Sequence, residues 1–85
     1  MTTHRLKTWM PYFEDVASGA KPFEVRRDDR GFQLGDSVRL IEVSSTPGDL
    51  IRTGREAEYE ITYVLTGGQF GIEPGYVVLG LGVQP

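Results

Sequence analysis

The stretch EAEYEITYVL, residues 56–65, alternates apolar and polar side chains more cleanly than any other segment of the chain. The odd-numbered positions carry the apolar residues Tyr59, Ile61, Tyr63 and Leu65. The even-numbered positions carry the polar residues Glu56, Glu58, Glu60 and Thr62. Because successive side chains of a strand point to opposite faces, this pattern predicts a long strand with an acidic outer face. The fold is therefore expected to be organised around a sheet.

Four shorter extended segments are predicted on either side of this strand. They are THRLKT (3–8), PFEVRR (22–27), SVRLIEV (37–43) and YVVLGLG (76–82). In SVRLIEV, Leu40 and Ile41 are apolar residues of opposite parity, so either both faces are covered or a bulge switches the faces. In PFEVRR, Phe23 and Val25 share the apolar face of a half-buried strand, and Glu24 and Arg26 share its polar side.

One short helix is predicted in MPYFEDVASG, residues 10–19. Pro11 suits a first helical turn, apolar residues recur at helical spacing, and Gly19 suits the stop. Residues 44–55, SSTPGDLIRTGR, have the composition of an exposed connection. Residues 66–75, TGGQFGIEPG, form a glycine-rich loop, whose glycines either admit a ligand to the backbone or only make a hairpin turn.

The resulting order is β-α-β-β-β-β, which belongs to the mainly β (α+β) class with an antiparallel-looking set of strands. A chain of 85 residues is expected to be one domain, residues 1–85, with a small core. About five strands and one short N-terminal helix of this size are expected to curl into a small β-barrel, with the helix closing one end.

Composition limits the chemistry. The chain has no cysteine and one histidine, which excludes thiolate zinc sites and cysteine catalysis, so we expect neither a metal nor a cofactor. No apolar run is long enough for a membrane span and the N-terminus lacks a signal-peptide pattern, so a cytoplasmic location and no membrane partner are expected. Because the chain has a net charge of −3, any nucleic acid would have to bind at a local basic patch.

Two motifs carry a family resemblance. Gly-x-Lys-x-Phe-Glu-x-Arg runs from Gly19 to Arg26, and Asp-Arg-x-Phe-x-x-Gly-Asp runs from Asp29 to Asp36. Together with TGGQFGIEPGYVVLGL, they resemble the ASCH-like domains of the PUA-like superfamily, most closely a family of small bacterial and phage proteins, domain of unknown function family 3850. The resemblance spans nearly the whole chain. It implies a PUA-like barrel with a cleft beside the helix and a role in recognising RNA or nucleosides.

Some ASCH domains remove the acetyl group of N4-acetylcytidine with a lysine, a threonine and a glutamate. By that resemblance the lysine corresponds to Lys21, but Glu24 stands at the threonine position, and a carboxylate cannot form the same nucleophile. Lys21 and Glu24 could instead act as an acid/base pair on a bound water. The resemblance thus leaves open whether the protein is an enzyme, and it favours binding over catalysis.

The expected site is a cleft formed by Lys21, Glu24 and Arg26. Further candidate ligand-binding residues are Lys7, His4, Arg30, Gln69, Trp9 and Phe70, the last two as stacking surfaces for an unpaired base; Tyr12 and Tyr63 are further aromatic candidates. Each has a structural alternative, such as a cation at a helix end for Lys21 or a hydrogen-bonded structural residue for His4. The acidic row at residues 56–60 would repel phosphate, so nucleic acid should approach the opposite, basic side.

Three functions follow from these observations. The favoured one is an RNA-binding or nucleotide- or nucleoside-binding domain that uses the cleft beside the helix. The second is an amidohydrolase or nuclease that acts on modified nucleosides or RNA, with Lys21 and Glu24 as its catalytic residues. The third is a phage or bacterial adaptor that binds a protein through an exposed strand edge. A monomer is expected in each case.

Overall fold

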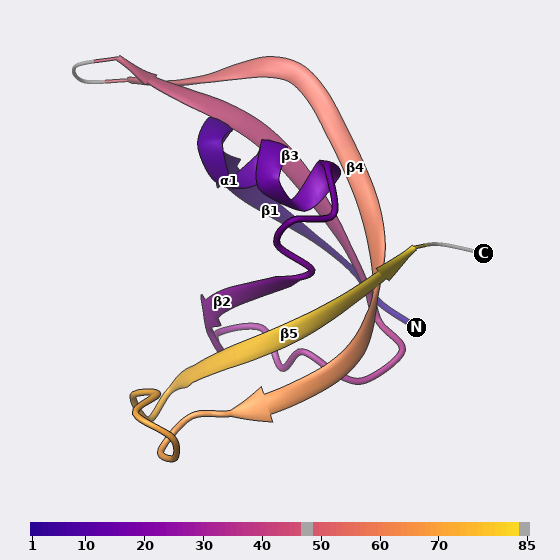
Figure 1. The fold of residues 1–85 in the computed structure, drawn as a ribbon, viewed down its shortest axis with the longest axis vertical. Coiled ribbons are helices and arrows are strands. Elements are labelled where there is room, and N and C mark those ends of the chain that lie inside the picture. Colours follow the sequence, from indigo (N-terminus) through magenta and orange to yellow (C-terminus); the bar gives the residue numbers. More distant parts are fainter. Residues whose placement is uncertain (47–48, 84–85) are drawn as a thin grey trace.

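The computed structural model describes residues 1–46 and 49–83. Along the chain lie β1 (Thr3–Trp9), α1 (Met10–Ala17), β2 (Phe23–Arg27), β3 (Ser37–Thr46), β4 (Asp49–Thr66) and β5 (Tyr76–Val83). The strands form a five-stranded sheet in the order β1-β3-β4-β5-β2, curled into a half-barrel with α1 inside its curve (Figure 1). The predicted class and element order are confirmed, and the edge strands of the half-barrel are β1 and β2.

The sheet is mixed, whereas the sequence suggested antiparallel strands. β1 pairs with β3 in parallel, and the other three neighbouring pairs are antiparallel. The reason lies in the connection. After β1, the chain passes through α1 and β2 before it reaches β3, and such a crossover returns it in the same direction. The helix that follows β1 is part of this crossover.

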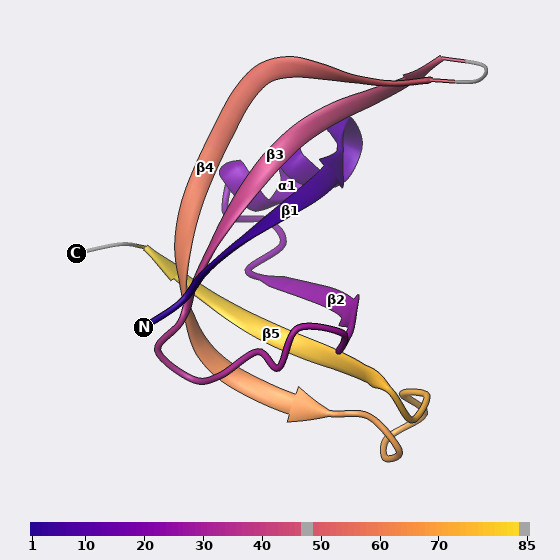
Figure 2. The same ribbon diagram turned by 180° about the vertical axis from the view of Figure 1, so that it is seen from behind.

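The expected connection at residues 44–55 is wrong for most of its length. β3 extends to Thr46 and β4 begins at Asp49, and residues such as Ser44 and Ile51 are paired across the two strands. This hairpin projects beyond the rest of the half-barrel in both views (Figures 1 and 2). Ser, Thr and Gly predicted a loop by composition, but pairing between two long strands overrides that local preference. Residues 47–48 lie outside the described part of the chain.

A bulge in β4 interrupts its pairing with β3, whereas the pairing of β3 with β1 runs without a break. Pairing jumps from Ile41 with Glu56 to Val43 with Arg52. The intervening part of β4 contains Gly54, whose φ of +95° is accessible chiefly to glycine and lets the strand bend there. Leu40 and Ile41 are both buried, so both faces of β3 are covered here, which is one of the two possibilities left open by the sequence.

The bulge also ties α1 to the sheet. Thr53 Oγ1 donates to buried Glu42 Oε1 at 2.6 Å, and Arg55 Nη1 lies 3.4 Å from Glu42 Oε2. Arg55 also donates to Glu14 of α1 at 2.9 Å, and its guanidinium lies 5.0 Å from the centroid of the Phe13 ring. Glu42 is thus buried with partners, as a carboxylate in a protein interior must be.

The main core lies between the concave face of the sheet and α1. Its buried members are Leu6, Phe13, Val16, Phe32, Val38, Leu40, Ile61, Val77 and Leu79. The helix contributes Phe13 and Val16, three residues apart and therefore on one face. Burying each such side chain contributes about 1.5–3 kcal/mol, so this contact holds the helix, and Trp9 before it, in place.

The alternation in residues 56–65 is interrupted in the structure. Ile61 is fully buried, but Tyr63, expected on the same face, is exposed. A register shift between Ile61 and Tyr63 in the pairing with β5 reverses the faces beyond it, so that Val64 packs against the core instead. A two-residue period shows where a strand is, but an extra residue in one strand of a pair moves the following side chains to the other face.

Candidate functional site

The faces of β2 are reversed relative to the sequence-based expectation. Val25 is 51% exposed and Phe23 is exposed as well, whereas Glu24 is 3% exposed. Glu24 is paired with the core residue Leu79 of β5, and Arg26 with the core residue Val77. The polar side of β2 therefore turns toward the concave interior of the half-barrel. This arrangement is stable only if the buried carboxylate finds opposite charges.

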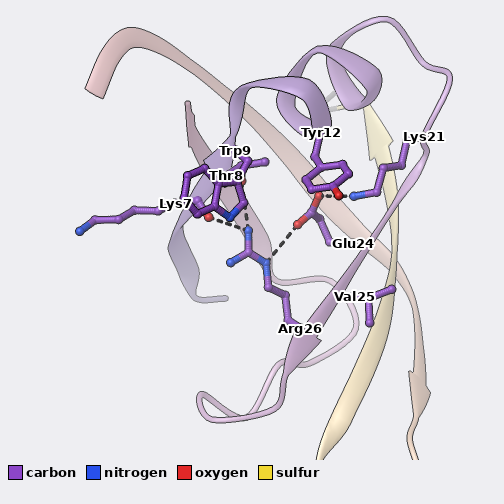
Figure 3. Close-up of a pocket in the computed structure, with 8 residues that line it drawn as sticks. All are labelled: Lys7, Thr8, Trp9, Tyr12, Lys21, Glu24, Val25 and Arg26. Atoms are coloured by element: carbon purple, nitrogen blue, oxygen red, sulfur yellow. Dashed lines mark hydrogen bonds and ion pairs between the residues drawn. The ribbon is translucent and has the colours of Figure 1, made fainter. Parts of the chain in front are cut away.

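Glu24 finds two such charges. Lys21 Nζ lies 2.8 Å from its Oε1, and Arg26 Nε lies 3.0 Å from its Oε2 (Figure 3). Lys21 comes from the segment between α1 and β2, where Gly19, with φ of +86°, ends the helix. The Lys21 ammonium also lies 5.3 Å from the ring centroids of both Tyr12 and Phe23. The exposed Phe23 ring therefore lies beside the Lys21 ammonium and does not belong to the core.

Arg26 connects β2 to β1, the opposite edge of the sheet. Its Nη2 donates to the Lys7 carbonyl oxygen at 2.8 Å and to Thr8 Oγ1 at 3.1 Å. Arg30 makes a similar bond from Nη1 to the Arg5 carbonyl oxygen at 2.9 Å. Arg26 therefore bridges the two edge strands, and Arg30 joins the segment after β2 to β1. Two alternate carbonyls of β1 are thus already bonded and are not free to pair with an added strand.

A hollow of about 390 Å³ opens beside these contacts. Its lining comes from β1, the start of α1 and β2: Lys7, Thr8, Trp9, Tyr12, Lys21, Glu24, Val25 and Arg26 (Figure 3). At its mouth Trp9 is 45% and Tyr12 53% exposed, although both are large aromatic side chains. The hollow combines exposed rings, three cations and one buried carboxylate.

A sequence model of the family described as "Domain of unknown function (DUF3850)" matches residues 3–81. The chain belongs to the DUF3850 family. No curated protein matches it. The matched range includes every residue that lines the hollow.

In this DUF3850 domain, five of the residues predicted for the site line the same hollow: Lys7, Trp9, Lys21, Glu24 and Arg26. Tyr12, which the sequence offered as a further stacking surface, joins them. The side chain of Lys7 extends outward from the cluster, away from Glu24 (Figure 3). The cluster at Lys21, Glu24 and Arg26 is thus inside the hollow, and Lys7 stands at its rim.

Sequence reasoning missed Thr8. This residue is buried and accepts from Arg26 at the inner wall of the hollow. A signal for it was present, because Thr8 shares the parity of Leu6, the apolar anchor of its strand. His4 shares this parity and lies inside the half-barrel. Lys7 has the opposite parity, so its side chain is exposed on the other face of β1.

His4 of the DUF3850 domain lies away from the hollow, in a buried structural contact. Its Nε2 is 2.9 Å from Asp36 Oδ2, and its ring meets the edge of Phe32 with centroids 4.7 Å apart. Asp36 also accepts from the backbone N–H groups of Thr2 and Gln33. The hydrogen bond from His4 is the largest cause that lowers the pKa of Asp36, and the two backbone donors lower it further against the opposing effect of burial.

Three other predicted residues also lie outside the hollow. Arg30 is engaged with the Arg5 carbonyl and, at 3.6 Å, with Asp29. Gln69 donates to the Thr66 carbonyl at 2.8 Å within the β4–β5 loop, and Phe70 of the same loop is almost fully exposed. That loop is a hairpin, closed by the bond from the Gly67 N–H to the Tyr76 carbonyl oxygen at 2.8 Å.

Two further features concern the described residues, 1–46 and 49–83. Within these residues, no three histidine, aspartate or glutamate side chains gather closely enough to hold a metal ion. Nor does any helix in this described part have the length and apolar character needed to cross a membrane. The side chains that line the hollow offer stacking, charge and hydrogen bonding.

Proposed function

We propose that this chain is an RNA-binding or nucleotide-binding domain, and that the hollow beside α1 takes one unpaired nucleotide. The observation that carries the proposal is the meeting of two half-exposed rings, Trp9 and Tyr12, with the Lys21–Glu24–Arg26 cluster in one hollow. A nucleobase needs such a combination, because its faces stack on aromatic rings and its edge exchanges hydrogen bonds with polar groups.

We further assign the half-barrel to the ASCH-like group of the PUA-like superfamily. Support comes from the two motifs, Gly19–Arg26 and Asp29–Asp36, and from the order of one helix and five strands. The first motif supplies the cluster in the hollow. The second supplies Asp36, which anchors His4 and the N-terminal backbone. The resemblance implies RNA or nucleoside recognition, which agrees with the chemistry of the hollow.

The side chains suggest distinct roles toward a nucleotide. Arg26 uses Nε and Nη2 for Glu24, Lys7 and Thr8, so Nη1 is the amino group that a ligand would meet. Glu24 can accept from a base amino group, because each carboxylate oxygen has more than one lone pair. Lys7 stands at the rim, where its ammonium can reach a phosphate without disturbing the cluster.

The test uses Trp9, the single tryptophan of the chain, as a reporter. Titration with the four nucleoside monophosphates is expected to quench its emission saturably for at least one of them. Tyr12→Ala should weaken that binding by about 5- to 150-fold, which corresponds to the loss of about 1–3 kcal/mol of stacking. Tyr63→Ala is the matched control, because Tyr63 is an exposed aromatic residue that does not line the hollow. Absence of saturable quenching, or equal effects of both substitutions, would overturn the proposal.

A second candidate function rests on the 2.8 Å contact between Lys21 Nζ and Glu24 Oε1 in the wall of the hollow. Such a pair can take a proton from a water and return it to a leaving group, as an amidohydrolase on a modified nucleoside requires. Hydrolysis of N4-acetylcytidine or cleavage of labelled RNA, abolished by Glu24→Gln, would establish this activity. Binding without turnover of either substrate between pH 5 and 9 would leave the domain as a binding module.

A further inference from the structure

A second hollow adjoins the first. It measures about 660 Å³ and is lined by Trp9, Met10, Pro11, Tyr12 and Ser44. Trp9 and Tyr12 line both hollows, so the two aromatic residues stand between them. Met10 adds a further exposed apolar surface, since 44% of it is exposed.

The two hollows differ in charge. Lys7, Lys21, Glu24 and Arg26 line the first, whereas the lining of the second consists of two aromatic residues, a methionine, a proline and one serine. Contiguous exposed apolar surface of this kind, unlike scattered single residues, is typical of contact sites. The uncharged hollow suits the face of a base, and the charged one suits a base edge with its phosphate.

We propose that the second hollow takes the base next to the one held in the first, so that the ligand is a single-stranded oligonucleotide rather than a free nucleoside or mononucleotide. This inference rests on the function proposed above. Trp9 and Tyr12 stand where two neighbouring bases would flank them, and consecutive stacking of bases on side chains is how single strands are held without a duplex. The cations that line the first hollow, with Lys7 at its rim, supply positive charge for the phosphate that joins the two nucleotides.

A protein side chain is the other occupant that an apolar hollow could take. The two hollows are continuous through Trp9 and Tyr12, so an occupant of the second hollow touches the same two rings as the ligand in the first. This shared contact favours a nucleotide that is joined to the first one. A mononucleotide leaves the far sides of these rings in water. A dinucleotide covers both sides and therefore gains affinity from surface already present in the free protein.

The experiment compares uridine 5′-monophosphate, the dinucleotide UpU and the corresponding adenine pair, each titrated against Trp9 emission. The expected result is that a dinucleotide binds at least about 5-fold more tightly than its mononucleotide, as one additional stacked base would provide. Met10→Ser is expected to reduce this advantage and leave mononucleotide affinity unchanged, because Met10 lines the second hollow and not the first.

Leu34→Ser is the matched control, since Leu34 is an exposed apolar residue that lines neither hollow. It should leave the dinucleotide advantage intact. Mononucleotide binding with no gain for the dinucleotide would overturn the second base site while the proposed function stands. A gain that Met10→Ser does not reduce would likewise overturn it, and failure of every nucleotide to bind would overturn both proposals.

Discussion

Arg26 donates from Nη2 to the Lys7 carbonyl oxygen at 2.8 Å, and this bond joins β2 to β1, two strands that do not pair with each other. The carbonyl lies at the edge of the sheet, where it would otherwise bond to water or to a neighbouring chain. The same guanidinium holds Glu24 in the wall of the hollow. Arg26 therefore contributes both to closure of the half-barrel, together with the bond from Arg30 to the Arg5 carbonyl, and to the shape of the candidate site.

Arg26→Lys should destabilise the fold although it conserves charge. A lysine ammonium cannot bridge Glu24, Thr8 and the Lys7 carbonyl with the fixed fork of a guanidinium. Loss of these partly buried bonds is expected to lower the free energy of unfolding by about 1–2 kcal/mol. Urea denaturation followed by circular dichroism measures the change, and Arg27→Lys, at the exposed neighbouring position, should stay within about 0.5 kcal/mol. Equal losses in the two variants would contradict this role of Arg26.

Lys21 and Glu24 should behave as an energetically coupled pair. Glu24→Gln leaves two cations beside a neutral amide, so we expect a loss of about 2–3 kcal/mol in the free energy of unfolding. Lys21→Met should cost less, because Arg26 still faces the carboxylate. In the double variant the loss should fall short of the sum of the single losses by about 1 kcal/mol. Additive losses in a thermal or urea double-mutant cycle would show that the pair is not coupled.

The stability of the protein should fall at acid pH through Asp36. Its folded-state pKa is lowered from the ordinary value of 3.8, chiefly by the hydrogen bond from His4, so the unfolded chain binds this proton more readily. The contribution of Asp36 is therefore complete above about pH 5 and is lost as the pH falls below 3.8 toward the lowered pKa.

Denaturation of Asp36→Asn at a series of pH values tests this. The variant should be less stable at pH 7, and its stability should change less than that of the parent protein between pH 5 and pH 3. Asp29→Asn is the control, because Asp29 is exposed and its contact with Arg30 is long, at 3.6 Å. If Asp29→Asn reduced the loss of stability between pH 5 and pH 3 as much as Asp36→Asn does, this loss could not be attributed to Asp36.

Gly67→Ala should be more damaging than Gly71→Ala in the same β4–β5 loop. A Cβ at Gly67 would collide with the carbonyl oxygens of Glu73 and Tyr76, which are backbone atoms and cannot rotate away. We expect a loss of about 3 kcal/mol in the free energy of unfolding. A Cβ at Gly71 would meet open space, so only its φ of +78° opposes alanine, at about 1 kcal/mol. Comparable melting temperatures for the two variants would contradict the close approach at Gly67.

Much of the fold could be predicted because it depends on local signals. The helix at residues 10–17 follows from Pro11, the spacing of Phe13 and Val16, and the Gly19 stop, all within one short segment. The strands could be predicted from the alternation of apolar and polar residues. The observed strand ends differ from the predicted ones mainly at the β3–β4 hairpin, where the composition indicated a loop. The parallel pairing of β1 with β3 could not be read in the same way, since pairing partners are far apart in the chain.

The site was predicted in part for a related reason. Lys21, Glu24 and Arg26 lie within one short motif, so their proximity followed from the sequence. The approach of Thr8, Trp9 and Tyr12 to that motif did not, because the sheet and helix bring these residues together. His4 separated from the site for the same reason, since its side chain faces Asp36.

What the sequence determined by itself is the identity of most elements and, away from the bulges, the division of a strand into two faces. What only the tertiary structure decided is which face turns inward. In β2 the apolar residues Phe23 and Val25 face out, and Glu24 faces in. Alternation describes a strand in isolation. The direction of its faces depends on the charges that other segments place opposite them, here Lys21 and Arg26 around one buried carboxylate.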